Sequence, residues 1–134
     1  MTPRTDHRHI LVVEDDEDLR EALRRILEVS FPVRVEAAAD AREALRKLAE
    51  GPLPQVVLSD LRMPGMDGLE LASEVHRRHP CVAFALMTAF RDADIERRVD
   101  GHPEVAAFFE KPHEVAAWQR ALGRVIALPS ACLA

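Results

Sequence analysis

Apolar residues of this chain gather in five short runs, and between the runs the apolar positions recur every three or four residues. The five runs are continuously apolar, which is typical of parallel strands that are covered by helices on both faces. They predict strands at residues 10–13, 33–35, 56–58, 82–87 and 105–109.

A helix-type pattern follows each predicted strand. The apolar stripes predict five helices, around residues 19–27, 41–48, 69–75, 93–99 and 115–126. The fourth stripe contains few apolar residues, and Asp40 with Glu43 resembles a capping box at the start of the second helix. Five strand–helix units in succession predict an α/β fold with a parallel sheet and a site at the carboxyl ends of its strands.

Length and composition favour one compact unit. The chain has 134 residues, of which 48% are hydrophobic and 31% charged, so we expect a single domain over residues 1–134 with its core at about 9–128 and no output domain. No apolar run approaches the roughly 20 residues that span a bilayer, which predicts no membrane insertion and a cytoplasmic location. The net charge of -5 argues against direct nucleic-acid binding. Cytosolic conditions predict reduced thiols at Cys81 and Cys132.

Polar residues follow four of the five predicted strands. They are Glu14-Asp15-Asp16, Asp60, Thr88 and Lys111-Pro112. Carboxylates brought together repel one another unless a cation joins them, and hard oxygen ligands suit Mg²⁺. A hydroxyl and an ammonium in the same pocket could hold the oxygens of a phosphoryl group, and Asp60 would then be the nucleophile that forms an acyl phosphate.

Each of these residues also has a structural interpretation. The acids after the first strand could favour a helix N-terminus, Asp60 could be a turn residue, and Thr88 could cap backbone amides. Their position in chain order at the ends of separate strands favours a shared site.

Four motifs resemble those of one family. The stretch ILVVEDD at 10–16 looks like its first strand and acidic pair, and DLRMPGMDG at 60–68 looks like its phosphoacceptor loop. The stretch LMTA at 86–89 resembles its switch threonine, and FFEKP at 108–112 resembles its aromatic switch position and lysine. The family is the receiver domain of bacterial two-component response regulators, and the resemblance covers nearly the whole chain.

The resemblance implies a phosphorylation site with a metal ion. Asp60 would accept a phosphoryl group from a sensor histidine kinase or a histidine phosphotransfer protein. Asp15 and Asp60 would bind Mg²⁺ together with the backbone carbonyl of Arg62, and Glu14 would act through metal-bound water.

The resemblance also implies a conformational switch and a fold. Thr88 and Lys111 would contact the phosphoryl oxygens, and Phe108 would turn inward when Thr88 moves. The bond between Lys111 and Pro112 should be cis. The fold should be flavodoxin-like, with a five-stranded parallel sheet in the order 2-1-3-4-5 and helices on both faces.

The function implied is that of a signalling domain that controls a partner and is not an enzyme, although it assists its own phosphorylation and autodephosphorylation. One alternative is a receiver-like scaffold that acts without phosphorylation. A second is a phosphohydrolase of the haloacid-dehalogenase type, but that chemistry needs an acid two residues after the nucleophile, where this chain has Arg62.

Two features depart from the family or modify its site. Residues 100–107 replace the family's usual Gly-Ala turn and belong to a surface that members use for partners or dimers, so a homodimer and the downstream protein stay open. The resemblance implies that Arg62 and Phe90 flank the path by which water would reach the phosphorus, and we expect them to modulate the mouth of the site; the alternative is that both side chains extend into solvent.

Overall fold

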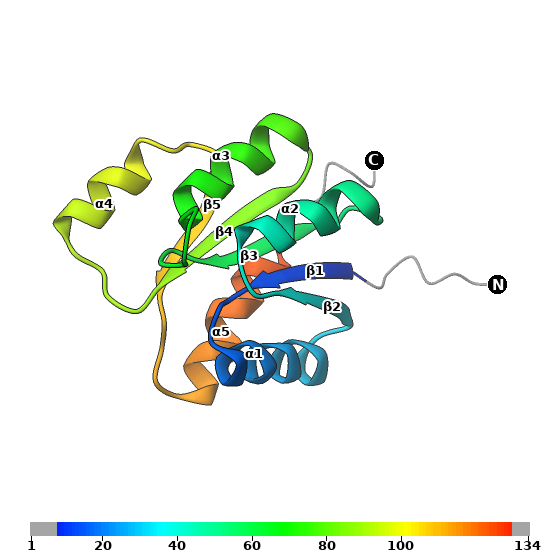
Figure 1. Cartoon of the computed structure of the whole chain (residues 1–134). Coiled ribbons are helices and arrows are strands. Elements are labelled where there is room, and N and C mark those ends of the chain that lie inside the picture. The colour runs from blue at the N-terminus through cyan, green and yellow to red at the C-terminus, as the bar shows by residue number, and fades with distance from the viewer. Residues whose placement is uncertain (1–7, 130–134) are drawn as a thin grey trace.

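The computed structural model describes residues 8–129 of the chain, in which strands and helices alternate (Figure 1). The elements are β1 (Arg8–Val13), α1 (Glu17–Ser30), β2 (Val33–Ala38), α2 (Ala41–Glu50), β3 (Val56–Asp60), α3 (Gly68–Arg78), β4 (Ala83–Thr88), α4 (Ala93–Asp100), β5 (Val105–Glu110) and α5 (Val115–Ile126). None of the helices in this part of the chain has the length and apolar character needed to cross a membrane.

The five strands form one parallel sheet in the order β2-β1-β3-β4-β5. In Figure 1, α1 and α5 lie on one side of the sheet, and α2 and α3 lie on the other. The predicted α/β class, the flavodoxin-like strand order and the five strand–helix units are confirmed. The strands extend up to three residues past the apolar runs: β2 continues to Ala38, and polar residues complete the carboxyl ends of β3 and β4.

Alternate side chains of each inner strand enter two separate cores. Ile10 and Val12 pack toward α1 and α5, whereas Leu11 and Val13 pack toward α2 and α3. All four side chains are at most 1% exposed. Burial on both faces explains why the inner strands read as unbroken apolar runs.

The edge strand β5 contains one extra residue. Phe84 pairs with Val105 and Ala85 pairs with Ala107, so Ala106 interrupts the register. A bulge of this kind reverses the face of every following side chain. Phe108 therefore packs into the same core as Val105, three positions earlier in the strand, and Phe109 lies on the opposite face of the sheet.

Helix α4 is the most loosely packed helix of the domain. Ile95 is its only buried residue, in agreement with the weak apolar stripe in the sequence. A polar contact ties the helix to the loop before α3, since Arg98 Nη2 lies 2.7 Å from Asp67 Oδ2. In Figure 1 the helix lies at the side of the molecule, beyond α3.

The predicted capping box at α2 forms only in part. The Asp40 side chain accepts a hydrogen bond from the Glu43 amide, but the Glu43 carboxylate accepts its bond from Ala39, one residue before the cap. The reciprocal box occurs instead at α3, where Asp67 and Glu70 each accept a hydrogen bond of 2.9 Å from the other's amide.

Two further expectations are wrong. The bond between Lys111 and Pro112 is trans, and the described residues contain no cis peptide bond. The trans form of such bonds is favoured by about 0.5–1 kcal/mol unless tertiary contacts select cis. Cys81 is disulfide-bonded, so its thiol is not reduced. Cys132 lies outside the described residues.

Gly68 allows α3 to begin directly beside the end of β3. A Cβ atom at this position would lie 2.4 Å from the carbonyl oxygen of Asp60 and 2.9 Å from Cα of Leu61. The Gly68 amide also donates a 2.8 Å hydrogen bond to the carbonyl of Leu61. The glycine therefore fixes the backbone on which the Asp60 side chain is carried.

We predict that Gly68→Ala lowers the free energy of unfolding by about 1–3 kcal/mol, because backbone atoms would have to move to admit the methyl group. Gly123→Ala in α5 is the control, since its Cβ would meet only a ring at 3.8 Å, and it should gain about 0.5–1 kcal/mol from helix propensity. Urea denaturation measures both. Equal stability of the two variants would contradict this role of Gly68.

Candidate functional site

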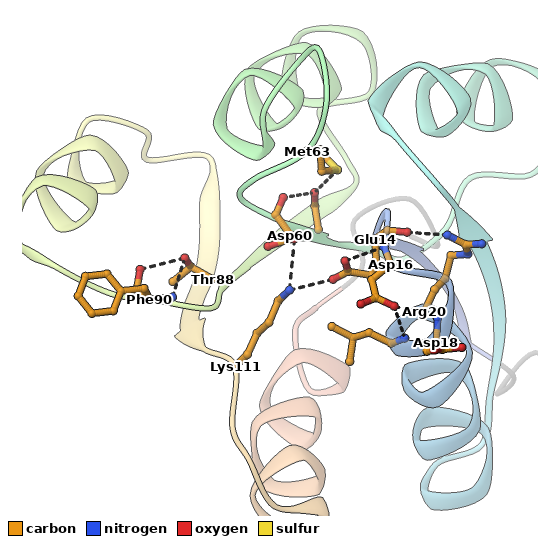
Figure 2. A network of polar contacts seen from close by, with 11 residues as sticks. Glu14, Asp16, Asp18, Arg20, Asp60, Met63, Thr88, Phe90 and Lys111 are labelled. Carbon is orange, nitrogen blue, oxygen red and sulfur yellow. Dashed lines mark hydrogen bonds and ion pairs between the residues drawn. The ribbon is translucent and has the colours of Figure 1, made fainter.

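The carboxyl ends of four strands meet at one edge of the sheet and carry the predicted residues (Figure 2). Glu14 and Asp15 follow β1, Asp60 is the last residue of β3, Thr88 is the last residue of β4 and Lys111 follows β5. All of them come from strands that are adjacent in the sheet, which is why residues so distant in sequence lie together.

Lys111 joins the acidic residues of two strands. Its Nζ lies 2.9 Å from Oε1 of Glu14 and 3.2 Å from Oδ2 of Asp60. The lysine backbone is held in place as well, since its amide donates a 2.7 Å hydrogen bond to the carbonyl of Thr88. The pairing of β4 with β5 thus positions the ammonium against the carboxylates of β1 and β3.

Burial controls the protonation of this cluster. Desolvation raises the pKa of Glu14 and of Asp60 above their ordinary values, although the ammonium of Lys111 opposes the shift at both. Burial alone would lower the pKa of Lys111, but its contacts with Glu14 and Asp60 outweigh this and raise it. One ammonium does not offset the desolvation of two carboxylates, so a further positive charge at the site would stabilise their ionised forms.

Three acidic residues could hold a metal ion. Carboxylate oxygens of Glu14, Asp15 and Asp60 all lie within 4.8 Å of one another, and Asp15 is exposed. Carboxylates with one side open to water fit Mg²⁺, which keeps several of its waters. The two oxygens of Glu14 already accept hydrogen bonds from Lys111 and from the Asp16 amide, which leaves Asp15 and Asp60 as the more available direct ligands.

The loop after Asp60 supports the carboxylate from its own backbone. The amide of Arg62 donates a hydrogen bond to Asp60 and acts to lower the pKa of that carboxyl. The Arg62 side chain is exposed and lines a hollow of about 270 Å³ with Asp67 and Arg98. This hollow lies on the side of α3 and α4.

The Thr88 side chain is buried but is engaged away from Asp60. Its hydroxyl donates to the carbonyl of Phe90 at 3.0 Å and accepts from the amide of Phe90 at 3.3 Å. Figure 2 shows the Phe90 ring directed away from Asp60, and Phe90 is 63% exposed. In this conformation neither side chain covers the Asp60 carboxylate.

Arg91 contacts Phe108, which the sequence pattern did not predict. Its guanidinium carbon lies 4.4 Å from the centre of the Phe108 ring, and its Nη1 lies 3.5 Å from the Phe108 carbonyl. The two residues are 17 positions apart, so no local spacing signals the contact. The signal in the sequence is an arginine three residues after the predicted switch threonine.

Comparison with known proteins agrees with this geometry. The sequence model of the protein family described as the response regulator receiver domain matches residues 10–122. The chain is 40% identical over 91 residues to the DNA-binding transcriptional regulator NtrC of Escherichia coli K12, an alignment that covers 63% of this chain and 18% of NtrC. It is 37% identical over 111 residues to the response regulator protein FleR of Pseudomonas aeruginosa, covering 81% of this chain and 22% of FleR. The chain therefore spans about a fifth of the length of these relatives.

Solved structures give the same result. The non-phosphorylated HemR receiver domain from Leptospira biflexa superposes with a TM-score of 0.78 at 33% identity, covering 91% of this chain and 96% of the other. The fold is also shared with the response regulator protein TrrA from Thermotoga maritima in complex with Mg²⁺ and BeF, with a TM-score of 0.75 at 24% identity over 88% of this chain and 98% of TrrA. The chain belongs to the receiver domains of two-component response regulators.

Proposed function

We propose that this chain is a single receiver domain, with its core at residues 9–128, that accepts a phosphoryl group on Asp60. The donor is a sensor histidine kinase or a histidine phosphotransfer protein, and the domain works in the cytoplasm. The observation that supports this most is the placement of Lys111 within 2.9–3.2 Å of the Glu14 and Asp60 carboxylates. An ammonium at this distance can move onto phosphoryl oxygens without leaving the site.

The transfer forms one bond and breaks one bond. A carboxylate oxygen of Asp60 attacks the phosphorus of a phosphohistidine in line with the leaving nitrogen, and an acyl phosphate forms. The phosphorus–nitrogen bond breaks, and the imidazole keeps the electron pair and takes up a proton. Lys111, whose pKa is raised by its contacts with the carboxylates, stays protonated and pairs with the phosphoryl oxygens.

The acidic residues fit Mg²⁺ at the same site. Asp15 and Asp60 would hold the ion with the backbone carbonyl of Arg62, and Glu14 would act through a bound water. Bound Mg²⁺ neutralises negative charge on the phosphoryl oxygens during transfer. The exposed position of Asp15 leaves room for the waters that such an ion retains.

Phosphorylation then changes the conformation of the β4–α4 region. The Thr88 hydroxyl exchanges the Phe90 carbonyl for a phosphoryl oxygen, and Phe108 turns toward the space that Thr88 leaves. The altered surface of α4 and β5 controls a partner. NtrC is named as a DNA-binding regulator; in this chain the net charge of -5 favours control of a partner protein or output domain, or a homodimer, over direct contact with nucleic acid.

We predict that acetyl phosphate with Mg²⁺ adds one phosphoryl group to the wild-type chain and none to Asp60→Asn. The asparagine lacks the carboxylate that must attack the phosphorus. Asp94→Asn is the control, because Asp94 is exposed on α4, and it should be phosphorylated like the wild type. Intact-protein mass spectrometry measures the gain; a gain that persists in Asp60→Asn would overturn the assignment of Asp60, and no gain in the wild type would support a scaffold that acts without phosphorylation.

We predict that Asp15→Asn weakens Mg²⁺ binding by about tenfold or more, roughly 1.4 kcal/mol, because it removes a charged ligand from the open side of the site. Asp18→Asn is the matched control, since Asp18 is an exposed acid in the first turn of α1. Calorimetric titration measures both affinities.

The same titration should show that Mg²⁺ affinity falls as the pH falls. The pKa values of Glu14 and Asp60 are raised by burial, so protons compete with the cation at a higher pH than they would at ordinary carboxylates. An unchanged affinity in Asp15→Asn would show that Asp15 is not a ligand of the ion. An affinity that does not depend on pH would show that Mg²⁺ does not bind to Glu14 and Asp60.

We predict that Arg62→Ala and Phe90→Ala each speed autodephosphorylation more than twofold, because a cationic chain and a ring at the mouth restrict the in-line approach of water. Phe90 is directed away from Asp60 in this conformation, so its effect requires the β4–α4 loop to move on phosphorylation. Arg97→Ala and Val29→Ala are controls at exposed positions. Acceleration below about twofold, ~0.4 kcal/mol of barrier, with Mg²⁺ saturating, would contradict the prediction.

A further inference from the structure

The guanidinium of Arg91 is held over one face of the Phe108 ring by three contacts. The stacking distance is 4.4 Å, the Phe108 carbonyl lies 3.5 Å from Nη1, and Nε donates to the carboxylate of Glu96. Glu96 lies one turn into α4, so the arginine connects the start of that helix to the middle of β5. The guanidinium is therefore held between the Phe108 ring and the Glu96 carboxylate and is not a free surface group.

Phe108 is well placed to respond to Thr88. In the register of β4 with β5, Phe108 lies opposite Leu86 and Glu110 lies opposite Thr88. Thr88 and Leu86 are two residues apart and share a face of the sheet, so Phe108 and Thr88 are diagonal neighbours on that face. Arg91 stacks on the Phe108 ring in the described conformation, so a turn of the ring toward Thr88 would change that contact.

We propose that Arg91 is a positioning residue that holds Phe108 in its unphosphorylated position and thereby slows the uptake of a phosphoryl group by Asp60. The inference rests on the proposed function and specifies how the resting state of that site is maintained. In this proposal the contact is made only in the unphosphorylated position of the ring, so its strength favours that position. An exposed cation–π contact changes the ratio of the two positions by about two- to fivefold, equivalent to about 0.5–1 kcal/mol.

A purely structural role for Arg91 gives a different result when the residue is replaced. If the arginine only anchors α4, its loss lowers both the stability of the fold and the rate of phosphorylation. If it restrains Phe108, its loss lowers stability but raises the rate, because the competent position becomes more populated. The loss of a positive charge would by itself reduce attraction of an anionic donor, so a higher rate cannot come from electrostatic steering.

The test compares Arg91→Gln with Arg97→Gln. Both variants remove one arginine that pairs with an acid of α4, but Arg97 pairs with Asp94 at positions that are 72% and 79% exposed. The rate of phosphorylation by acetyl phosphate with saturating Mg²⁺ is followed by mass spectrometry, and stability by urea denaturation. Arg91→Gln should react about two- to fivefold faster than the wild type while unfolding more easily, and Arg97→Gln should match the wild-type rate.

Two further variants isolate the ring contact from the charge. Arg91→Lys keeps the charge but lacks the planar group that stacks on the ring, so its rate should lie between those of the wild type and Arg91→Gln. Glu96→Gln removes the carboxylate that orients the guanidinium and should raise the rate above that of Asp94→Asn, which removes an equal charge from an exposed position of the same helix. An Arg91→Gln rate equal to or below the wild type, or an equal rise in Arg97→Gln, would overturn the proposal.

A measurement without any phosphodonor separates this inference from the proposed function. The chain has five phenylalanines, and fluorine-labelled phenylalanine gives each a signal that single substitutions assign. Relaxation dispersion at Phe108 measures the population of the minor ring position on the microsecond to millisecond timescale. A two- to fivefold larger population in Arg91→Gln, but not in Arg97→Gln, supports the restraint even if Asp60 takes no phosphoryl group; equal populations, or no minor position in either variant, overturn it.

Discussion

Two buried carboxylates that share one ammonium determine how the strand ends of this domain are arranged. Glu14 is 1% exposed and Asp60 is 6% exposed, and both contact Lys111. Removing one partner of a buried charge pair costs several kcal/mol because an uncompensated charge remains, so β1, β3 and β5 have to end at the same level. The β4–β5 pairing carries this requirement to Thr88, whose carbonyl fixes the lysine backbone. The site and the sheet therefore depend on the same few contacts.

Packing in the domain is tight around that edge and loose beside it. The Asp60 loop leaves no space for even a methyl group at Gly68. Helix α4, in contrast, fully buries one isoleucine, worth about 1.5–3 kcal/mol. Its other links are the partly buried Val99 and ion pairs near the surface that each contribute little. The weakly held helix α4 can therefore change its position while the carboxylates of the rigid site stay in place. This contrast supports the proposal that phosphorylation changes the conformation of the β4–α4 region.

The sequence was sufficient to predict the fold and the strand-end residues that the structure brings together. The reason is that parallel strands bring their carboxyl ends to one edge of the sheet whatever their sequence separation. It did not predict side-chain directions. The Thr88 hydroxyl, the Phe90 ring and the Arg91 guanidinium depend on rotamers and on distant partners. Asp40 and Asp67 both begin the same cap pattern with a glutamate three residues later, and only the course of the preceding backbone decides which forms the reciprocal box. The pairing state of Cys81 also depends on tertiary structure.

The extra residue at Ala106 assigns different tasks to two adjacent, chemically identical rings. Phe108 contacts Arg91 on one face of the sheet, and Phe109 meets Trp118 of α5 edge-on at 6.2 Å on the other. Deletion of Ala106 would remove the bulge and leave Val105 and Phe108 on the same face, two positions apart. If Ala106 were instead paired in a regular ladder, strict alternation would direct the side chains of Val105 and Phe108 to opposite faces, and Phe108 would become part of the α5 packing. The composition of the strand would be the same in that case, so the pairing register of β5 carries information that no residue identity in the strand encodes.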